Sequence, residues 1–316
     1  MNEEERSSYR PHFRRVEAEP FRIQPRDLET LRQVYKHRFL RSSHIAALDG
    51  GSEQHVRRRL KHLYHAGFLD RLRERIDWPG GEARKPYIYG LGKNGAELLQ
   101  EELGIKLGRL DWAGKNREIG QRYLDHTLLT ADVLVGFELA CRRRGTVRMI
   151  DPGEILAHAP EATRRTRYPF RWRVPVIHEG TRYVLGAIPD GIFGLYFLEK
   201  PEGRNRAYFF LEADRATMPV ERASLNRSSL FRKLLAYWET WKGKVHTERF
   251  GIQNFRVLTV TTTADRAAHI QAAALKASGG RGRNLFLTAD VETIASADPL
   301  TASWSNAKGS LIGLTE

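Results

Sequence analysis

The chain lacks several features that would assign a protein to a class at once. Cys141 is the only cysteine among 316 residues, which excludes an intramolecular disulfide framework and a cysteine-rich zinc site. No apolar run approaches the roughly 18 residues that a membrane-spanning helix needs. The charged start, MNEEERSSYR, does not resemble a secretory signal. We therefore expect a cytoplasmic protein that has no membrane partner.

Acidic residues are the minority among the charged ones. The sequence contains 52 Lys and Arg against 38 Asp and Glu, a formal net charge of +14. Lysines and arginines that neutralise phosphates release counterions, so a basic chain favours a polyanionic partner. Nucleic acid is the leading candidate, although an anionic membrane surface or a ribosome would attract the same total charge. The length favours two domains, each with a core of its own.

The first part of the chain predicts an arm followed by helices. Residues 1–24 are polar and show no periodicity, which indicates a flexible arm. A first helix is predicted to begin at Pro25, and a second, RSSHIAALDGG, is predicted to end at Gly50 and Gly51. In a third helix, apolar residues recur with helical spacing. Its opposite face carries the polar residues Gln54, Arg57, Arg58, Lys61, His62 and His65.

A strand, LDRLRERI, follows the third helix, and after a turn-rich stretch come a second strand, YIYGL, and a helix that starts GKNGAELLQ. Three helices followed by a two-stranded ribbon resemble a winged-helix domain, here over residues 25–105. The resemblance implies that the polar face of the third helix enters the major groove of double-stranded DNA. It also implies that Arg84 and Lys85, at the tip of the wing, contact the phosphate backbone. A winged helix that docks to protein is the alternative.

A linker at about 105–117 leads to a second domain, residues 116–316. This domain is predicted to begin with a long apolar helix, NREIGQRYLDHTLLTADVLVGFELACRRRG. Strands are expected at TVRMI, WRVPVIH, TRYVLGAI, GIFGLYFL, RAYFFLE, FRVLTVTT and NLFLT, with helices at about 225–243 and 265–277. Hairpins followed by a strand, a helix and a strand predict a mixed sheet flanked by helices, so the whole chain is expected to be α+β or α/β.

Three acids gather at the open end of one predicted hairpin, AIPDGIFGLYFLEKPEGRNRAYFFLEADRAT. If the turn centres near Pro201, Asp190 lies across from Glu212, and Asp214 points to the same face as Glu212 because side chains alternate along a strand. Like charges on one face repel unless they are compensated, and Mg²⁺ or Mn²⁺ accepts oxygen ligands of this kind. The hairpin therefore predicts a metal site. A scaffold without activity and a coincidental grouping of acids are the alternatives.

The Pro189-Asp190 pair and the strand that contains Glu212 resemble the PD-(D/E)xK nuclease superfamily, which has a restriction-endonuclease-like fold. The resemblance implies that Asp190 and Glu212 are metal ligands and that Glu138, on the preceding helix, supplies a further acid. Asp214 occupies the position of the superfamily's lysine, so it is expected to be another metal ligand or an outer-shell group. The missing cation is expected from Arg215 or from Lys233 on the following helix.

Read over nearly its whole length, the chain resembles the replication-relaxation family of plasmids and integrative elements. The stretches that carry the resemblance are RFLRSSHIAAL, RRRLKHLYHAGFL, LDHTLLTADVLVGFELA, IPDGIF, FFLEADRAT, FRKLLAYW and DPLTASWSNAKGSLIGL. The resemblance implies a role in replication, relaxation or mobilisation of DNA. In a relaxase that used a tyrosine nucleophile, Tyr237 would be a candidate.

Arginines alternate with aromatic residues in the stretch RYPFRWR. One face of the strand predicted there would carry Tyr168, Phe170 and Trp172, and the other Arg167, Arg171 and Arg173. Such interleaving suits phosphate neutralisation with base stacking on single-stranded DNA. The alternative is a strand whose aromatics pack inward while its arginines are solvated.

Two functions of different classes follow from these patterns. The first is a metal-dependent DNA endonuclease, a nickase or relaxase, whose partners are double-stranded DNA and single-stranded DNA at a nick. The second is a sequence-specific regulator or initiator that binds DNA without chemistry. The sequence leaves open whether the chain forms a homodimer, the DNA target and the strand that would be cut.

Overall fold

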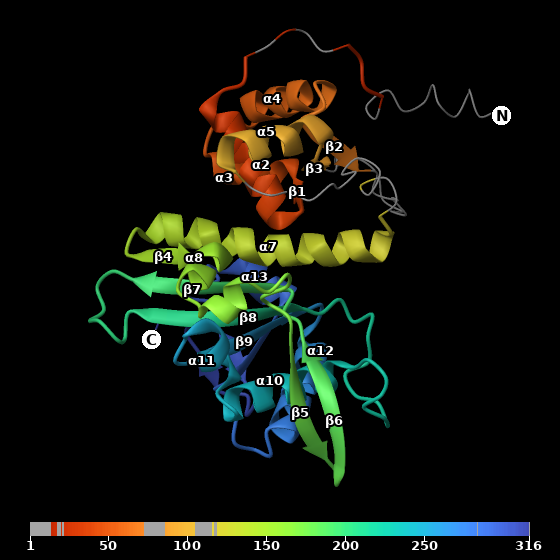
Figure 1. The fold of residues 1–316 in the computed structure, drawn as a ribbon, viewed down its shortest axis with the longest axis vertical. Coiled ribbons are helices and arrows are strands. Elements are labelled where there is room, and N and C mark those ends of the chain that lie inside the picture. Colours follow the sequence, from red (N-terminus) through yellow and green to blue (C-terminus); the bar gives the residue numbers. More distant parts are fainter. Residues whose placement is uncertain are drawn as a thin grey trace, which may run out of the picture. The chain divides into compact units, whose positions relative to one another are not determined.

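The computed structural model describes residues 14–17, 20, 22–72, 86–104, 116, 119–282 and 284–315. Most of the predicted arm and linker lies outside the described residues, and so do Arg84 and Lys85. By its internal contacts the chain divides into two compact units, Met1–Asp132 and Val133–Glu316 (Figure 1). The helix α7, Gln121–Arg144, begins in the first unit and ends in the second.

The first unit combines helices with a small antiparallel sheet, whose strand order is β1-β3-β2. Its elements in chain order are α2 (Pro25–His37), β1 (Phe39–Arg41), α3 (Ser42–Asp49), α4 (Glu53–His65), β2 (Leu69–Leu72), β3 (Ile88–Leu91) and α5 (Lys93–Leu103). The predicted order of helices and strands is therefore confirmed, with β1 as an additional short strand.

Helix α4 takes its place because its apolar residues face inward at helical spacing. Val56, Leu60 and Leu63 are buried, as their periodicity predicts. Arg59 reaches back from α4 to the start of α2, where its Nε donates to Asp27 at 2.7 Å. This ion pair ties the two helices together, and Asp27, which accepts it, is 2% exposed.

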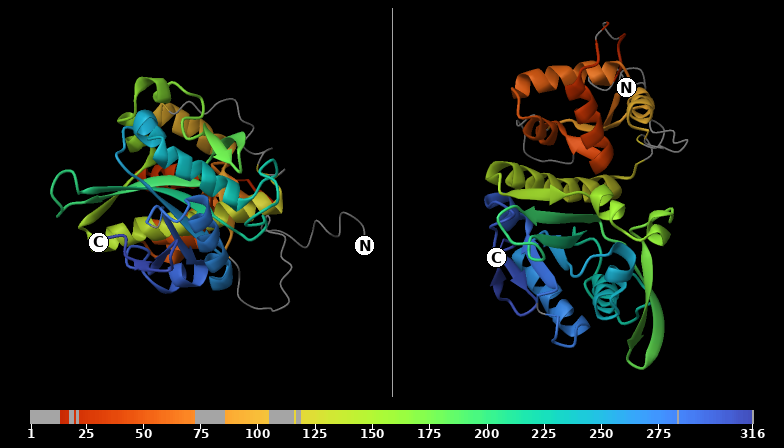
Figure 2. Two further views of the ribbon diagram at one scale, coloured as in Figure 1. Left: turned by 90° about the horizontal axis from the view of Figure 1, so that it is seen from below. Right: turned by 60° about the vertical axis from the view of Figure 1, so that its left-hand side comes forward.

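The second unit is built on a mixed seven-stranded sheet with the order β12-β11-β10-β9-β8-β7-β4. A separate antiparallel hairpin, β5–β6, extends from the rest of this unit (Figure 2). The strands are β4 (Val147–Ile150), β5 (Trp172–His178), β6 (Thr181–Ala187), β7 (Gly191–Phe197), β8 (Arg206–Ala213), β9 (Arg256–Thr261), β10 (Phe286–Asp290), β11 (Trp304–Asn306) and β12 (Leu311–Ile312). Neighbours β8, β9 and β10 run parallel, and the other pairs are antiparallel.

Alternation along the strands sorts the core of the second unit into two faces. Phe193 and Phe209 pair across β7 and β8, and their rings stack on each other. Phe193 also contacts the ring of Phe137 in α7. The next pair, Ile192 and Phe210, points to the opposite face. That face belongs to a cluster with the helices α10 (Leu230–Lys242) and α12 (Ala264–Ala277). Even-numbered residues of β8 therefore face α10.

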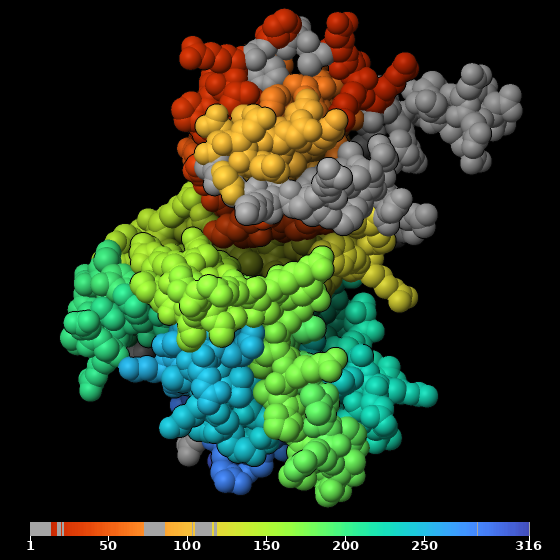
Figure 3. All heavy atoms as spheres, in the orientation of Figure 1, coloured from red at the N-terminus to blue at the C-terminus, as the bar shows by residue number. Residues whose placement is uncertain are grey.

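The shorter helices of this unit are α8 (Pro152–Ala157), α9 (Glu161–Arg164), α11 (Val245–Phe250) and α13 (Val291–Ser296). The turn that joins β7 to β8 projects from the surface of the unit (Figure 3). The predicted class, helices with a mixed sheet, is confirmed. Among the residues that the structure describes, none of the helices combines the length and the apolarity that crossing a bilayer requires.

The strand WRVPVIH begins at Trp172 as predicted, but the alternation expected for RYPFRWR does not extend ahead of it. Residues 167–171 form turns, and β5 starts only at Trp172. Trp172 is buried and Phe170 packs on the core, whereas Tyr168 is 49% exposed. The guanidinium groups of Arg167 and Arg171 lie over the Tyr168 ring, 5.2 and 4.8 Å from its centre. The regular alternation was wrong here, because Pro169 donates no backbone hydrogen bond and sits within the turn.

Candidate functional site

The hairpin of β7 and β8 has the register that its sequence predicts. Gly191 pairs with Leu211, which brings Asp190 opposite Glu212 at the next position. The backbone N–H of Asp190 donates to the carbonyl of Leu211 at 2.9 Å, and the N–H of Ala213 donates to Asp190 Oδ2 at 2.9 Å. Both carboxylates point toward α10, because they continue the face of Ile192 and Phe210.

Glu212 is held by two side chains of α10. Its own side chain is 2% exposed, and Lys233 Nζ lies 2.5 Å from Oε2. The hydroxyl of Tyr237 donates to Oε1. Lys233 and Tyr237 are one helical turn apart and therefore share a face. Ser229 starts this helix in register, since its hydroxyl accepts from the N–H of Arg232 at 3.3 Å.

Lys233 also connects the two carboxylates. Its Nζ lies 3.8 Å from Asp190 Oδ1, in addition to its contact with Glu212. Lys233 is 29% exposed and Asp190 14%, so this end of the network reaches solvent while Glu212 does not. Asp190, Glu212 and Lys233 form what we call the carboxylate–lysine cluster. Lys233 had been predicted from the sequence as a relocated cation.

Asp214 belongs to a neighbouring network and not to this cluster. Arg266 of α12 donates to both of its oxygens, from Nε at 2.8 Å and from Nη2 at 3.0 Å. Thr261, at the end of β9, donates its hydroxyl to Asp214 Oδ2 at 2.7 Å. Asp214 faces the helices as alternation predicted, but its charge is compensated by an arginine 52 residues further along the chain.

Burial governs the protonation of the cluster. Burial and the neighbouring charge of Asp190 raise the pKa of Glu212 to about 8, against the lowering effects of Lys233 and Tyr237. Burial alone would lower the pKa of Lys233, but Glu212 and Asp190 raise it above its ordinary value. Burial and the adjacent Glu212 also raise the pKa of Tyr237 well above its usual range. Glu212 is therefore poised to exchange a proton near neutral pH.

Asp190 and Glu212 together could ligate a hard cation such as Mg²⁺. Mg²⁺ commonly takes one or two carboxylates and keeps several waters, so Asp190 and Glu212 are a sufficient protein contribution. Glu138, the further acid expected, instead lies 2.6 Å from Arg142 and near Cys141 and Asp298. Within the described part of the chain, no group of three or more His, Cys, Asp or Glu side chains is placed to hold a metal ion.

The repulsion among the three acids, from which the sequence predicted a metal, is compensated by basic side chains of the protein. Lys233 balances Asp190 and Glu212, and Arg266 balances Asp214. A metal is thus not needed to make the three acids tolerable. Arg215, the other cation expected, is half-buried and follows Asp214 in the chain.

The predicted DNA-facing residues of the first unit lie along α4. Gln54, Arg57, Arg58 and Lys61 are exposed, while His62 and His65 are half-buried. Arg57 is paired with Glu53 at 2.6 Å, and His65 Nδ1 accepts from the N–H of Val16 at 3.2 Å. The remaining predicted DNA contacts, Arg167, Arg171 and Arg173, are exposed in the second unit.

A comparison with protein-family models identifies the family of the chain. The model of the replication-relaxation family matches residues 31–254, which is most of the chain. The chain belongs to the replication-relaxation family. Membership gives this replication-relaxation protein a role in replication or relaxation of a plasmid or related element. No curated protein and no solved structure matches it.

The sequence did not predict the roles of two residues of this replication-relaxation protein, Tyr237 and Arg266. Tyr237 had been considered as a nucleophile, but it is fully buried and its hydroxyl is bonded to Glu212. Arg266 was not considered at all. The one signal for Tyr237 is its position four residues after Lys233, which puts both on one helical face. No sequence signal links Arg266 to Asp214, because their contact depends on how α12 packs.

Proposed function

We propose that this protein binds duplex DNA of a plasmid or other mobile element and cleaves one strand of it during replication, relaxation or mobilisation. The observation that carries the proposal is the carboxylate–lysine cluster. Lys233 lies within reach of both Asp190 and Glu212, and so supplies the cation that the E-x-D triplet itself lacks. Family membership supports the biological setting.

We assign DNA docking to the first unit, as a winged helix with α4 as the recognition helix. Support comes from the order of its helices and antiparallel strands, which is that of helix-turn-helix variants carrying a ribbon. Along α4, Arg58 and Lys61 are exposed and make no hydrogen bond or ion pair with any described residue. Their charges are therefore free to neutralise phosphates.

We assign cleavage to the second unit, as a nuclease-like domain of the PD-(D/E)xK type. Asp190 and Glu212 would hold Mg²⁺ or Mn²⁺, an ion that in such sites activates water and stabilises charge in in-line displacement at phosphorus. Lys233 would stabilise negative charge that develops on the phosphate. Tyr237 would orient Glu212, and Arg266 would keep Asp214 aligned at the edge of the site.

The decisive experiment incubates purified protein with supercoiled cognate plasmid and Mn²⁺ and follows the open-circle product. We expect nicking by the wild type and none by Asp190→Ala, Glu212→Gln or Lys233→Met, with duplex affinity retained in all three. Lys242→Ala is the matched control, since Lys242 lies on the same helix, is 58% exposed and pairs only with Glu239 among the described residues. Equal nicking by wild type and Glu212→Gln would refute the assignment.

A second function is favoured by one observation. Both oxygens of Glu212 and both oxygens of Asp214 already have partners within the protein. Such a self-compensated network suits a scaffold that binds DNA as a regulator or initiator without cleaving it. Calorimetric titration of Mn²⁺ into the wild type and Asp190→Ala separates the two functions, because the regulator should show the same heat for both proteins.

A further inference from the structure

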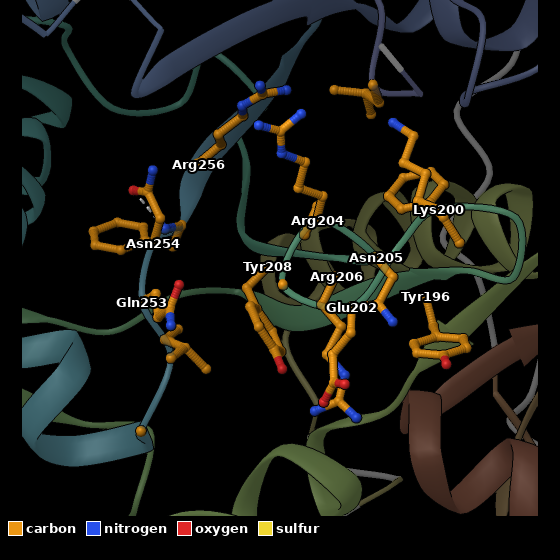
Figure 4. A pocket seen from close by; sticks show the side chains of 17 residues that line it. Tyr196, Lys200, Glu202, Arg204, Asn205, Arg206, Tyr208, Gln253, Asn254 and Arg256 are labelled. Atoms are coloured by element: carbon orange, nitrogen blue, oxygen red, sulfur yellow. Dashed lines mark hydrogen bonds between the residues drawn. The ribbon is translucent and has the colours of Figure 1, made fainter.

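A second site lies at the opposite end of the same hairpin, where the turn between β7 and β8 faces the segment that leads into β9. The two segments enclose a cavity of about 680 Å³ (Figure 4). A volume of this size is within the range of small-ligand sites, roughly 300–1,000 Å³. We call it the turn pocket. The residues that matter for the argument are Tyr196, Arg204, Arg206, Tyr208, Asn254 and Arg256.

The turn pocket is rich in cations and poor in acids. Four basic residues line it, Lys200 and the three arginines, against a single acid, Glu202. Among the described residues, the side chains of Arg204, Arg206 and Arg256 form no ion pair, and Glu202 forms none either. Figure 4 shows Arg204 and Arg256 directed toward the same part of the cavity. Arg206 acts electrostatically on Glu154, so Arg204 and Arg256 are the cations whose charge most favours an external anion.

Arg256 makes this case most clearly. It is half-buried at the start of β9, and no acceptor in the described part of the chain bonds its guanidinium. Burial lowers the pKa of Arg256, with no carboxylate acting in the other direction. A half-buried guanidinium gains more from a charge-assisted hydrogen bond than a fully solvated one, so a bound anion would be favoured here. Lys200, by contrast, already donates to the carbonyl of Thr315 at 2.7 Å.

Asn254, two residues before Arg256, adds a neutral donor to the pocket. The side-chain oxygen of Asn254 accepts from Trp241 Nε1 at 3.2 Å and from the N–H of Phe255 at 2.9 Å. Its amide nitrogen is therefore left as a donor. Tyr196 and Tyr208 are half-buried, and the guanidinium of Arg206 lies 5.7 Å from the centre of the Tyr196 ring. These rings and Arg206 lie on the face of the sheet that packs toward α10, whereas Arg256 pairs with Phe209 on the other face, and Figure 4 shows the tyrosines directed away from Arg204 and Arg256.

We propose that the turn pocket binds a nucleotide phosphate through Arg204 and Arg256. The ligand chemistry is that of a phosphate attached to a nucleoside, either free or within a single strand. The site is distinct from the carboxylate–lysine cluster, because Arg206 and Glu212 lie six residues apart on β8, roughly 20 Å at the rise of a strand. It therefore extends the contact surface beyond that of the proposed cleavage.

The test measures binding to the full chain in EDTA, so that its result does not depend on cleavage. The probes are a short labelled oligothymidine, the mononucleotide dTMP and inorganic phosphate. The double variant Arg204→Ala/Arg256→Ala should bind the strand about tenfold more weakly, as expected when charge-assisted contacts are removed. The slope of log affinity against log salt should become shallower by about 1.4, since two single-strand phosphate contacts are lost.

Controls keep this result specific. Arg182→Ala removes an exposed arginine of the same unit outside the pocket and should leave binding unchanged. If the double variant does not fold, Arg204→Ala alone replaces it in the binding measurement, because Arg204 lies exposed in the turn.

The arms of the experiment identify the source of the phosphate. Binding of the oligothymidine but not of dTMP, lost in the double variant, assigns the pocket to single-stranded DNA. Binding of dTMP with the same loss assigns it to a free nucleotide. Binding of all three probes that is equal in wild type and double variant, or no binding of any probe, overturns the proposal.

Discussion

The two ends of the β7–β8 hairpin handle charge in opposite ways. At the open end, Asp190 and Glu212 are balanced by Lys233, and Asp214 is balanced by Arg266. At the closed end, Arg204, Arg206 and Arg256 line a cavity without forming an ion pair among the described residues. The acids of the open end have cations of the protein beside them, whereas Arg204 and Arg256 at the closed end form no ion pair among the described residues. Removing a partner should therefore cost more stability at the open end than at the closed end.

The largest loss of folding stability should come from replacing Lys233 at the open end. Replacing Lys233 by Met leaves Asp190 and Glu212 without their shared cation, and loss of one partner of a buried pair costs about 3–5 kcal/mol. Because Lys233 is 29% exposed, we expect about 2–3 kcal/mol in the free energy of unfolding, measured with urea at pH 8. The double variant Lys233→Met/Glu212→Gln should recover most of this loss, and a failure to recover would show that the two residues are not coupled.

The dependence of folding stability on pH tests the protonation of Glu212 at the open end. The pKa of Glu212 is raised from 4.5 to about 8, so the native protein keeps a proton that the unfolded chain releases. Its contribution to stability is fully present below about 4.5 and is lost as pH rises through about 8. Urea unfolding in EDTA should therefore show wild-type stability falling across this window, by at most about 1.4 kcal/mol per pH unit.

Glu212→Gln is the control for that series. It removes the titration while keeping a side chain that can accept from Tyr237, so its stability should depend less on pH. Parallel curves for the two proteins would mean that Glu212 has an ordinary pKa in the folded state.

The Arg266–Asp214 pair should have a smaller effect. Arg266 is 17% exposed and Asp214 5%, and Arg266 also donates to the carbonyl of Met218 at an edge of the network. Arg266→Ala should lower the free energy of unfolding by about 2 kcal/mol, because a buried carboxylate loses two hydrogen bonds. Strand binding at the turn pocket should not change, and a loss of it would contradict the separation of the two ends.

The smallest effect on folding is expected at the closed end. Arg256→Met removes a half-buried cation that has no partner, so the free energy of unfolding should change by less than about 1 kcal/mol or increase slightly. Added phosphate should raise the melting temperature of the wild type but not that of Arg256→Met, because a ligand stabilises only the state that binds it. A large destabilisation by Arg256→Met would show that Arg256 serves the fold.

Much of the scaffold follows from local patterns. The strands of the second unit from β4 to β10 lie where alternation and β-branched residues predict them, and α4 buries Val56, Leu60 and Leu63 as its periodicity requires. Short elements such as α8, α11 and β12 were not predicted. They carry too few residues to show a period, and packing against the sheet decides them.

The sequence by itself determined that Asp190 stands opposite Glu212, because a hairpin's turn fixes the register of its two strands. Only the tertiary structure decided what meets these acids. Tyr237 and Arg266 are separated from their partners by 25 and 52 residues, and such contacts depend on how α10 and α12 pack on the sheet. The turn pocket likewise joins β8 to the segment before β9, so its unpaired arginines became evident only once the chain was folded.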